Sequence, residues 1–202
     1  MTSRLARNSA IRRSRSPFLG LFVLLGACTG VPDGVQVIDG FELDRYLGTW
    51  YEIARLDHSF ERGLTNVTAN YSMREDGGVR VLNLGYDPEK GEWDEAEGKA
   101  YFIGQTDVGS LKVSFFGPFY GGYNIIELDK ANYQYSVVAG PDRGYLWILA
   151  RTPDLDPTTR DRLVSVARDL DFPVDADGNV YAAEGPNSLS WAGGAFTKYS
   201  VE

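Results

Sequence analysis

The stretch LGTWYEIARLD, residues 47–57, decides the fold. A glycine is followed by alternating polar and apolar residues, which is typical of a strand that leaves a tight corner. Glu52 and Arg55 stand among residues that are otherwise apolar. Because an unpaired carboxylate in a protein core is costly, we expect Glu52 to be paired. Its partner is either Arg55, through a bend in the strand, or a lysine such as Lys112.

Seven more strand-like segments follow at regular spacing. Turn sequences rich in Gly, Pro, Asp and Asn separate them, among them EDGG, DPEKG, GPFYGG and PDRG. The eight expected strands cover residues 49–57, 66–74, 79–86, 92–104, 111–116, 123–129, 133–140 and 145–152. Successive strands with short links predict an all-β fold, an eight-stranded antiparallel up-and-down β-barrel. A barrel of this size has room for one small ligand.

One helix is expected after the last strand. Asp156 is a suitable N-cap and Pro157 a suitable first helical residue. Apolar residues then recur at helical spacing, namely Leu163, Val166, Ala167 and Leu170. In YLWILA, residues 145–150, both faces of the strand are apolar, so both must be covered. We therefore expect the helix to pack outside the barrel against one face while the other face looks inward.

The first 27 residues have the features of a signal peptide. A cationic stretch precedes an apolar run of about ten residues, which is too short to cross a membrane. The sequence LGAC, residues 25–28, ends with the only cysteine of the chain and resembles the site at which bacterial lipoproteins are acylated and cleaved. Cys28 is thus the predicted lipid anchor. The residue after it, Thr29, resembles those found at this position in lipoproteins that are sorted to the outer membrane. Export by the general secretory or the twin-arginine route stays open.

These features divide the chain into four parts. We expect a signal peptide at 1–27, an acylated cysteine with a flexible tether at 28–40, a barrel domain at 41–181 and a poorly structured tail at 182–202. The net charge is -8 for the whole chain and about -13 without residues 1–27 (15 basic against 28 acidic residues). So acidic a body is not expected to bind nucleic acid or to adsorb directly to anionic lipid.

At this point the pattern resembles the lipocalin family, and within it the bacterial outer-membrane lipoproteins of the apolipoprotein D type. Gly48 and Trp50 are similar to the Gly-x-Trp of the first lipocalin strand, and Arg151 to the arginine of the last. The stretches DHSFERGLTNVTANYS, LKVSFFGPFYGGYNIIELD and GPDRGYLWILARTP resemble the bacterial branch. The middle Thr-Asp-Tyr motif of the family is met only loosely, by Leu128-Asp129 with Tyr133 downstream.

The resemblance carries expectations about function. It implies that Trp50 closes one end of the barrel and that Arg151 packs across it, both in structural roles. It also implies a fatty acid or lysophospholipid ligand, attachment to the periplasmic face of the outer membrane, and a possible homodimer. Storage, transport or repair of envelope lipids would follow from these properties.

Alternation along the strands predicts which side chains line the cavity. Asn83 would add a polar group able to hold a headgroup or a water molecule. A β-bulge would reverse the assignment for every residue after it. The predicted lining is Ala54, Tyr71, Met73, Val81, Asn83, Phe102, Val113, Phe115, Tyr123, Ile125, Tyr135, Val137 and Trp147.

Catalytic chemistry has little support in the sequence. The acidic run at residues 89–98 is more simply a solvated hairpin than a glycosidase site, and His58 is expected to close a loop near the barrel mouth. We predict no catalytic residue, metal or cofactor. Two alternatives stay open: a lipid hydrolase or isomerase that uses the cavity, and an envelope scaffold without ligand. Loss of turnover on replacing Glu52 or His58 would favour the enzyme.

Overall fold

The computed structural model describes residues 29–174 in full and the backbone of residues 181–182, 189–192 and 195–198. The expected signal peptide and Cys28 lie outside the described residues. The elements in chain order are α1 (Leu43–Tyr46), β1 (Gly48–Arg55), β2 (Thr65–Met73), β3 (Val79–Asp87), β4 (Glu92–Phe102), β5 (Ser110–Ser114), β6 (Gly121–Leu128), β7 (Tyr135–Ala139), β8 (Leu146–Ala150), α2 (Pro157–Asp169), β9 (Tyr181–Ala182), β10 (Leu189–Ala192) and β11 (Ala195–Lys198).

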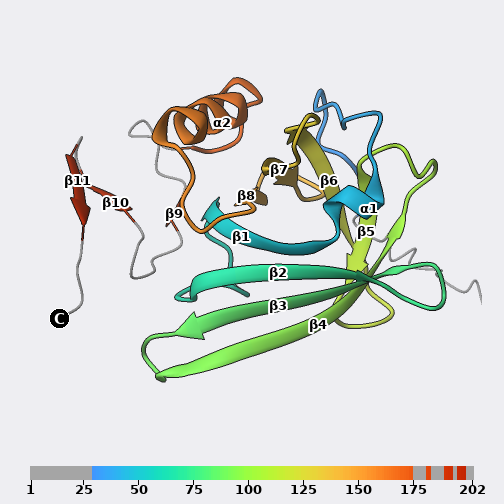
Figure 1. Ribbon diagram of the computed structural model, residues 1–202, viewed down its shortest axis with the longest axis horizontal. Coiled ribbons are helices and arrows are strands. Elements are labelled where there is room, and N and C mark those ends of the chain that lie inside the picture. The colour runs from blue at the N-terminus through green and yellow to red at the C-terminus, as the bar shows by residue number, and fades with distance from the viewer. Residues whose placement is uncertain (1–28, 175–180, 183–188, 193–194, 199–202) are drawn as a thin grey trace, which may run out of the picture.

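Strands β1 to β8 form a closed barrel (Figure 1). Each strand pairs antiparallel with the next, and β1 pairs with both β2 and β8. This closure confirms the predicted eight-stranded up-and-down barrel. The loops after β1, β3, β5 and β7 lie at one end, the open end, while α1 and the loops after β2, β4 and β6 lie at the other, the closed end.

Part of the predicted tail forms strands. β9 pairs with Ala54 and Arg55 of β1, beyond the residues that pair with β2. β10 and β11 form a separate two-stranded antiparallel sheet. The other residues of the 182–202 segment lie outside the described residues.

The expected helix is confirmed as α2, outside the barrel (Figure 1). The Asp156 carboxylate accepts a hydrogen bond from the Thr159 backbone N–H, so it caps the helix as predicted. The buried helix residues are Leu163, Val164 and Ala167, which pack in one apolar cluster with strand residues that include Leu146 and Ile148. Val164 thus takes the place predicted for Val166.

Arg151 and Trp50 close one end of the barrel. The guanidinium carbon of Arg151 lies 4.0 Å from the ring centroid of Trp50, which is fully buried. Arg151 also donates hydrogen bonds to the carbonyls of Arg45, Thr49 and Tyr133. Gly48 has φ of +91°, a conformation that favours glycine, and a Cβ there would lie 3.5 Å from Arg151. The first strand therefore begins directly against this arginine.

The segment predicted to be a flexible tether is held against the barrel. Asn124 is fully buried, and its side-chain N–H donates to the carbonyls of Gly30 and Gly140. Ile38 bonds through its backbone to Ile125 and to Gly109, and Val35 is buried in the cluster that includes α2. Residues 30–35 therefore run along the outside of the barrel, while Ile38 packs against the interior cluster.

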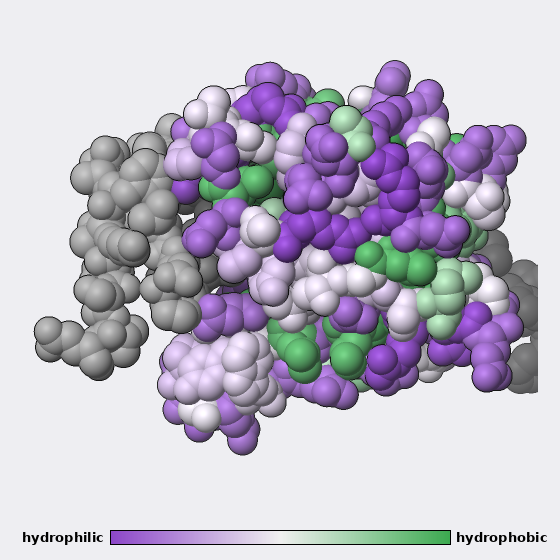
Figure 2. Space-filling view, viewed as in Figure 1, coloured by the Kyte–Doolittle hydropathy of each residue, from purple (hydrophilic) through white to green (hydrophobic). Residues whose placement is uncertain are grey.

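Hydrophilic residues cover most of the face seen in Figure 2. Exposed aromatic residues gather instead on open-end loops and strand ends. Phe116 and Phe119, between β5 and β6, are 81% and 65% exposed, while Tyr120 lies under the ammonium of Lys112. Within the described part of the chain, no helix has the length and apolarity needed to cross a membrane.

Replacing Arg151 with lysine should lower the free energy of unfolding by about 1–3 kcal/mol. A lysine cannot reproduce the planar fork that spans three carbonyls while stacking on the indole. Urea unfolding followed by circular dichroism measures the change. Arg62→Lys, at a largely exposed side chain, is the control and should stay within about 0.5 kcal/mol of the unsubstituted protein. An equal effect of both substitutions would contradict the role given to Arg151.

Candidate functional site

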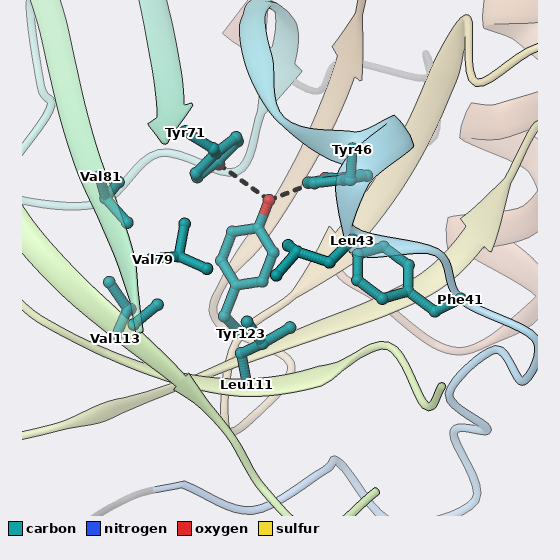
Figure 3. A pocket seen from close by; sticks show the side chains of 10 residues that line it. Phe41, Leu43, Tyr46, Tyr71, Val79, Val81, Leu111, Val113 and Tyr123 are labelled. Carbon is teal, nitrogen blue, oxygen red and sulfur yellow. Dashed lines mark hydrogen bonds between the residues drawn. The ribbon is translucent and has the colours of Figure 1, made fainter. Parts of the chain in front are cut away.

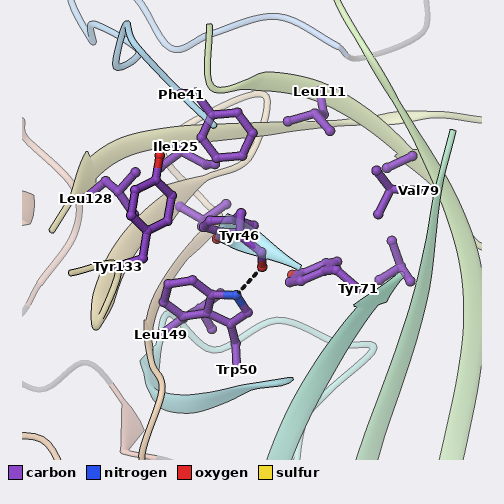
Figure 4. Packing of buried hydrophobic residues seen from close by; sticks show 13 residues of the cluster. Phe41, Tyr46, Trp50, Tyr71, Val79, Leu111, Ile125, Leu128, Tyr133 and Leu149 are labelled. Atoms are coloured by element: carbon purple, nitrogen blue, oxygen red, sulfur yellow. Dashed lines mark hydrogen bonds between the residues drawn. The ribbon is translucent and has the colours of Figure 1, made fainter. Parts of the chain in front are cut away.

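The barrel interior is filled by an apolar cluster rich in aromatic rings (Figure 4). Trp50 forms its floor, and its indole N–H donates to the carbonyl of Tyr46 at 2.8 Å. The buried members are Phe41, Tyr46, Trp50, Tyr71, Val79, Val81, Ala100, Leu111, Ile125, Leu128, Tyr133, Val138 and Leu149. This interior is separate from the cluster between the barrel and α2, so the barrel has its own core.

A cavity opens within this interior (Figure 3). Its empty space is about 320 Å³, counting the part that is open to solvent. The lining comes from α1, the residues just before it and strands β2 to β6, and consists of Phe41, Leu43, Tyr46, Tyr71, Val79, Val81, Ala100, Leu111, Val113 and Tyr123. The side chains leave little free room, so a long acyl chain would enter only if some of them moved.

Three tyrosine hydroxyls meet at the wall of this cavity. The Tyr123 hydroxyl lies 2.8 Å from those of both Tyr46 and Tyr71 (Figure 3). The Tyr46 hydroxyl also lies 3.0 Å from Ser136 Oγ. Burial raises the pKa of Tyr46 to about 12 and that of Tyr71 and Tyr123 well above 10. These phenols therefore stay neutral and act as paired hydrogen-bond donors and acceptors in an apolar chamber.

Most of the predicted lining residues do face the interior. Tyr71, Val81, Val113 and Tyr123 line the cavity itself. Ile125, Phe102, Phe115 and Trp147 belong to or pack against the interior cluster. Asn83 pairs with Ala69, which packs against the same cluster, and the side-chain oxygen of Asn83 is buried without a hydrogen-bond partner among the described residues. Contact of any of these with a ligand remains a prediction.

Four predicted lining residues lie elsewhere. Ala54 and Val137 are buried on the outer side, in the cluster with α2, and Tyr135 packs against it. Met73, at the end of β2, is 50% exposed. A bulge in β1 between Glu52 and Ala54 reverses the side on which Ala54 lies. Tyr133 points inward, but it precedes β7 and has φ of +56°. The alternation within β7 is therefore not continuous with Tyr133, and Ser136 and Val138 are the β7 residues that face inward.

Sequence reasoning missed the residues that close the cavity from below. Leu43 and Tyr46 belong to α1 and Phe41 lies just before it, where no strand alternation exists to place them. The signal in the sequence that could have identified these residues is the apolar pattern of FELDRYL, residues 41–47. It predicts that one face of this segment is buried, but not that this face points into the barrel. Val79, Ala100 and Leu111 were also missed, at the ends of strands facing the closed end.

The bulge in β1 also explains the charged residues of the opening stretch. Glu52 and Arg55 pair with Leu149 and Trp147 of β8, so both face inward. Without the extra residue, strict alternation would have placed them on opposite faces. The Arg55 guanidinium forms a close ion pair with the Glu52 carboxylate, and Glu52 is only 7% exposed. The partner of Glu52 is therefore Arg55; Lys112 lies over Tyr120 instead.

The loop after β1 adds two more titratable groups. The Glu61 carboxylate accepts a hydrogen bond from the indole N–H of Trp147 at 3.0 Å. His58 Nε2 lies 3.1 Å from the same oxygen, and the His58 ring stacks on Phe60 with 4.0 Å between ring centroids. Both His58 and Glu61 are buried, near the open end as expected for His58. Among the described residues no group of His, Cys, Asp or Glu is arranged to hold a metal ion.

The model of the lipocalin-like domain family matches residues 41–176, which include all eight barrel strands and α2. The chain belongs to the lipocalin family. This result confirms the resemblance drawn from Gly48, Trp50 and Arg151.

Relatives of this lipocalin include bacterial proteins with a common name. The outer membrane lipoprotein Blc of Vibrio cholerae is 56% identical over 150 residues, covering 74% of this chain and 88% of that protein. The protein of the same name from Escherichia coli K12 is 55% identical over 153 residues, with 75% and 86% covered. Apolipoprotein D of Rattus norvegicus is 36% identical over 141 residues, with 67% and 71% covered. The bacterial relatives are named as lipoproteins, not enzymes, and their location agrees with that predicted here.

Solved lipocalin structures share the fold at low sequence identity. Insecticyanin from the tobacco hornworm superimposes with a TM-score of 0.60 at 18% identity, covering 79% of this chain and 89% of that one. At that identity the likeness concerns the barrel architecture alone.

Removing the Tyr123 hydroxyl, which lies between those of Tyr46 and Tyr71, should destabilise the protein. Tyr123→Phe leaves the buried Tyr71 hydroxyl without the partner that it has here, at a cost of about 1–3 kcal/mol in unfolding free energy. Chemical denaturation at pH 7 measures the loss. Tyr120→Phe, on the loop after β5, is the matched control and should change stability by less than about 0.5 kcal/mol. If the two variants were equally stable, the Tyr123 hydroxyl would not contribute to the stability of the protein.

Proposed function

We propose that this lipocalin is a membrane-anchored lipid-binding protein. Its barrel would hold the acyl chain of a fatty acid or lysophospholipid for storage, transport or repair of envelope lipids. The observation that carries the proposal is the closed, apolar interior, with a cavity lined by side chains from α1 and β2 to β6. About 55% identity to proteins named outer membrane lipoprotein supports it.

The energetics of such binding are adequate. Burial of an acyl chain of about sixteen carbons, at roughly 0.8 kcal/mol per methylene, releases on the order of 12 kcal/mol. A micromolar dissociation constant needs about 8 kcal/mol after the costs of association and of moving side chains. Because the cavity is small, part of the gain would be used to displace side chains such as Leu43.

The anchor belongs to the same proposal. Acylation of Cys28 would hold the protein at the periplasmic face of the outer membrane, as the names of the bacterial relatives support. Gly30 is bound to Asn124, so the acylated cysteine would be only two residues from a point fixed on the barrel. Two or three acyl chains give firm attachment, where a single chain would be marginal.

The experiment is native mass spectrometry of the full chain, purified in mild detergent from bacterial membranes and followed by lipid extraction. We expect one lipid adduct per chain, with the mass of a fatty acid or lysophospholipid. Val81→Trp should reduce adduct occupancy at least tenfold, because an indole would fill the cavity. Arg80→Trp places the same bulk on the neighbouring residue, which is paired with Glu97 on the outside, and should leave occupancy unchanged.

Other outcomes separate the alternatives. An unliganded mass that persists after incubation with both lipid classes would contradict lipid binding and favour the scaffold. Release of a hydrolysed or isomerised lipid, abolished by replacing Glu52 or His58, would favour the enzyme. The mass of the denatured chain reports acylation of Cys28 in the same preparation.

A further inference from the structure

The loop between β1 and β2, residues 56–64, is attached to the barrel by buried polar contacts. The Arg55 guanidinium donates to the carbonyls of Glu61 at 2.8 Å and Leu64 at 3.0 Å, while it also pairs with Glu52. In return, the Glu61 carboxylate accepts from Trp147 on β8. One guanidinium and one carboxylate thus connect the loop to two strands at the open end of the barrel.

The charges in this network do not balance. Two buried carboxylates, Glu52 and Glu61, lie near the single guanidinium of Arg55, which pairs with the Glu52 carboxylate and binds Glu61 through its backbone carbonyl. The other titratable groups beside them are His58 on the loop and Tyr71 on β2, and Tyr71 is held neutral by burial. A buried excess negative charge is costly, so the closed arrangement is most stable when one carboxyl group carries a proton.

We propose that Glu52, Arg55 and Glu61 form a proton-operated latch, which holds the 56–64 loop closed over the barrel interior while one proton is bound and loosens it when both carboxylates are ionised. The use of the latch, to control lipid entry and exit, rests on the proposed function. The existence of the latch does not rest on the proposed function, because every contact that forms it is within the protein.

The direction of the pH effect follows from the closed state. Burial and then the charge of Glu61 raise the pKa of Glu52 to about 7, against the lowering effect of Arg55. When the loop opens to water, the pKa of Glu52 should return to an ordinary value of about 4.3. The closed loop therefore binds a proton that the open loop releases. Closure is favoured at low pH, and this contribution is lost as pH rises from about 4.3 through about 7.

Hydrogen–deuterium exchange of the full chain in detergent micelles tests the latch without any lipid ligand. After correction for the intrinsic pH dependence of exchange, we expect the opening constant of backbone amides in residues 56–64 to rise at least tenfold between pH 5.5 and 8.0, since one unit of pKa shift corresponds to tenfold. Amides of the β3–β4 turn, where the acidic Glu89 is exposed, provide the internal reference.

Variants assign the titrating group. Glu52→Gln and Glu61→Gln mimic the protonated carboxyl and should each keep the loop protected at pH 8.0. Glu97→Gln, at an exposed acid, should leave the pH profile unchanged. His58→Gln should retain the pH profile as well. A flat pH profile in His58→Gln, together with an unchanged pH profile in Glu52→Gln, would overturn the assignment to the carboxyl groups. A flat profile in the unsubstituted protein would overturn the latch itself.

The proposed function is tested separately by the release rate of a bound lysophospholipid. Faster release at pH 8.0 than at pH 5.5, abolished in Glu52→Gln, would support both proposals. A pH-dependent loop in a protein that binds no lipid would support the latch and contradict the lipid carrier.

Discussion

The pairing of β1 with both β2 and β8 is the constraint on which the other features depend. A sheet of eight strands has two edges, and β1 removes both by bonding on each side. Closure creates an inside and an outside from a single sheet. The inside becomes an apolar chamber with its own core, while the outside of β7 and β8 becomes the surface on which α2 packs.

The interior combines two kinds of polar group within apolar surroundings. Near the closed end, the hydroxyls of Tyr46, Tyr71 and Tyr123 satisfy one another without charge. Near the open end, Arg55 pairs with the Glu52 carboxylate and binds the Glu61 backbone carbonyl, and this network carries a charge that depends on pH. The neutral group can serve as a fixed wall of the cavity, whereas the charged network has two states. The fold therefore places its adjustable part where a ligand would pass.

Sequence reasoning predicted the architecture because strands, turns and a capped helix each leave a local signal. It also placed Tyr71, Val81, Val113 and Tyr123 at the cavity, through simple alternation. It failed for Ala54 because the bulge in β1 has no signature in the sequence, and for Val137 because the backbone at Tyr133 interrupts alternation. Partners such as Glu61 for Trp147, 86 residues apart, emerge only once the barrel has closed.

Nuclear magnetic resonance with a ¹³C-labelled lysophospholipid bound to the methyl-labelled protein shows whether the barrel holds an acyl chain inside. We expect intermolecular nuclear Overhauser effects from the acyl methylenes to the methyl groups of Val79, Val81 and Val113, which line the cavity. Effects confined to methyl groups at the surface, such as those of the exposed Met73 and Ile103, would contradict an interior site and place the lipid on the surface.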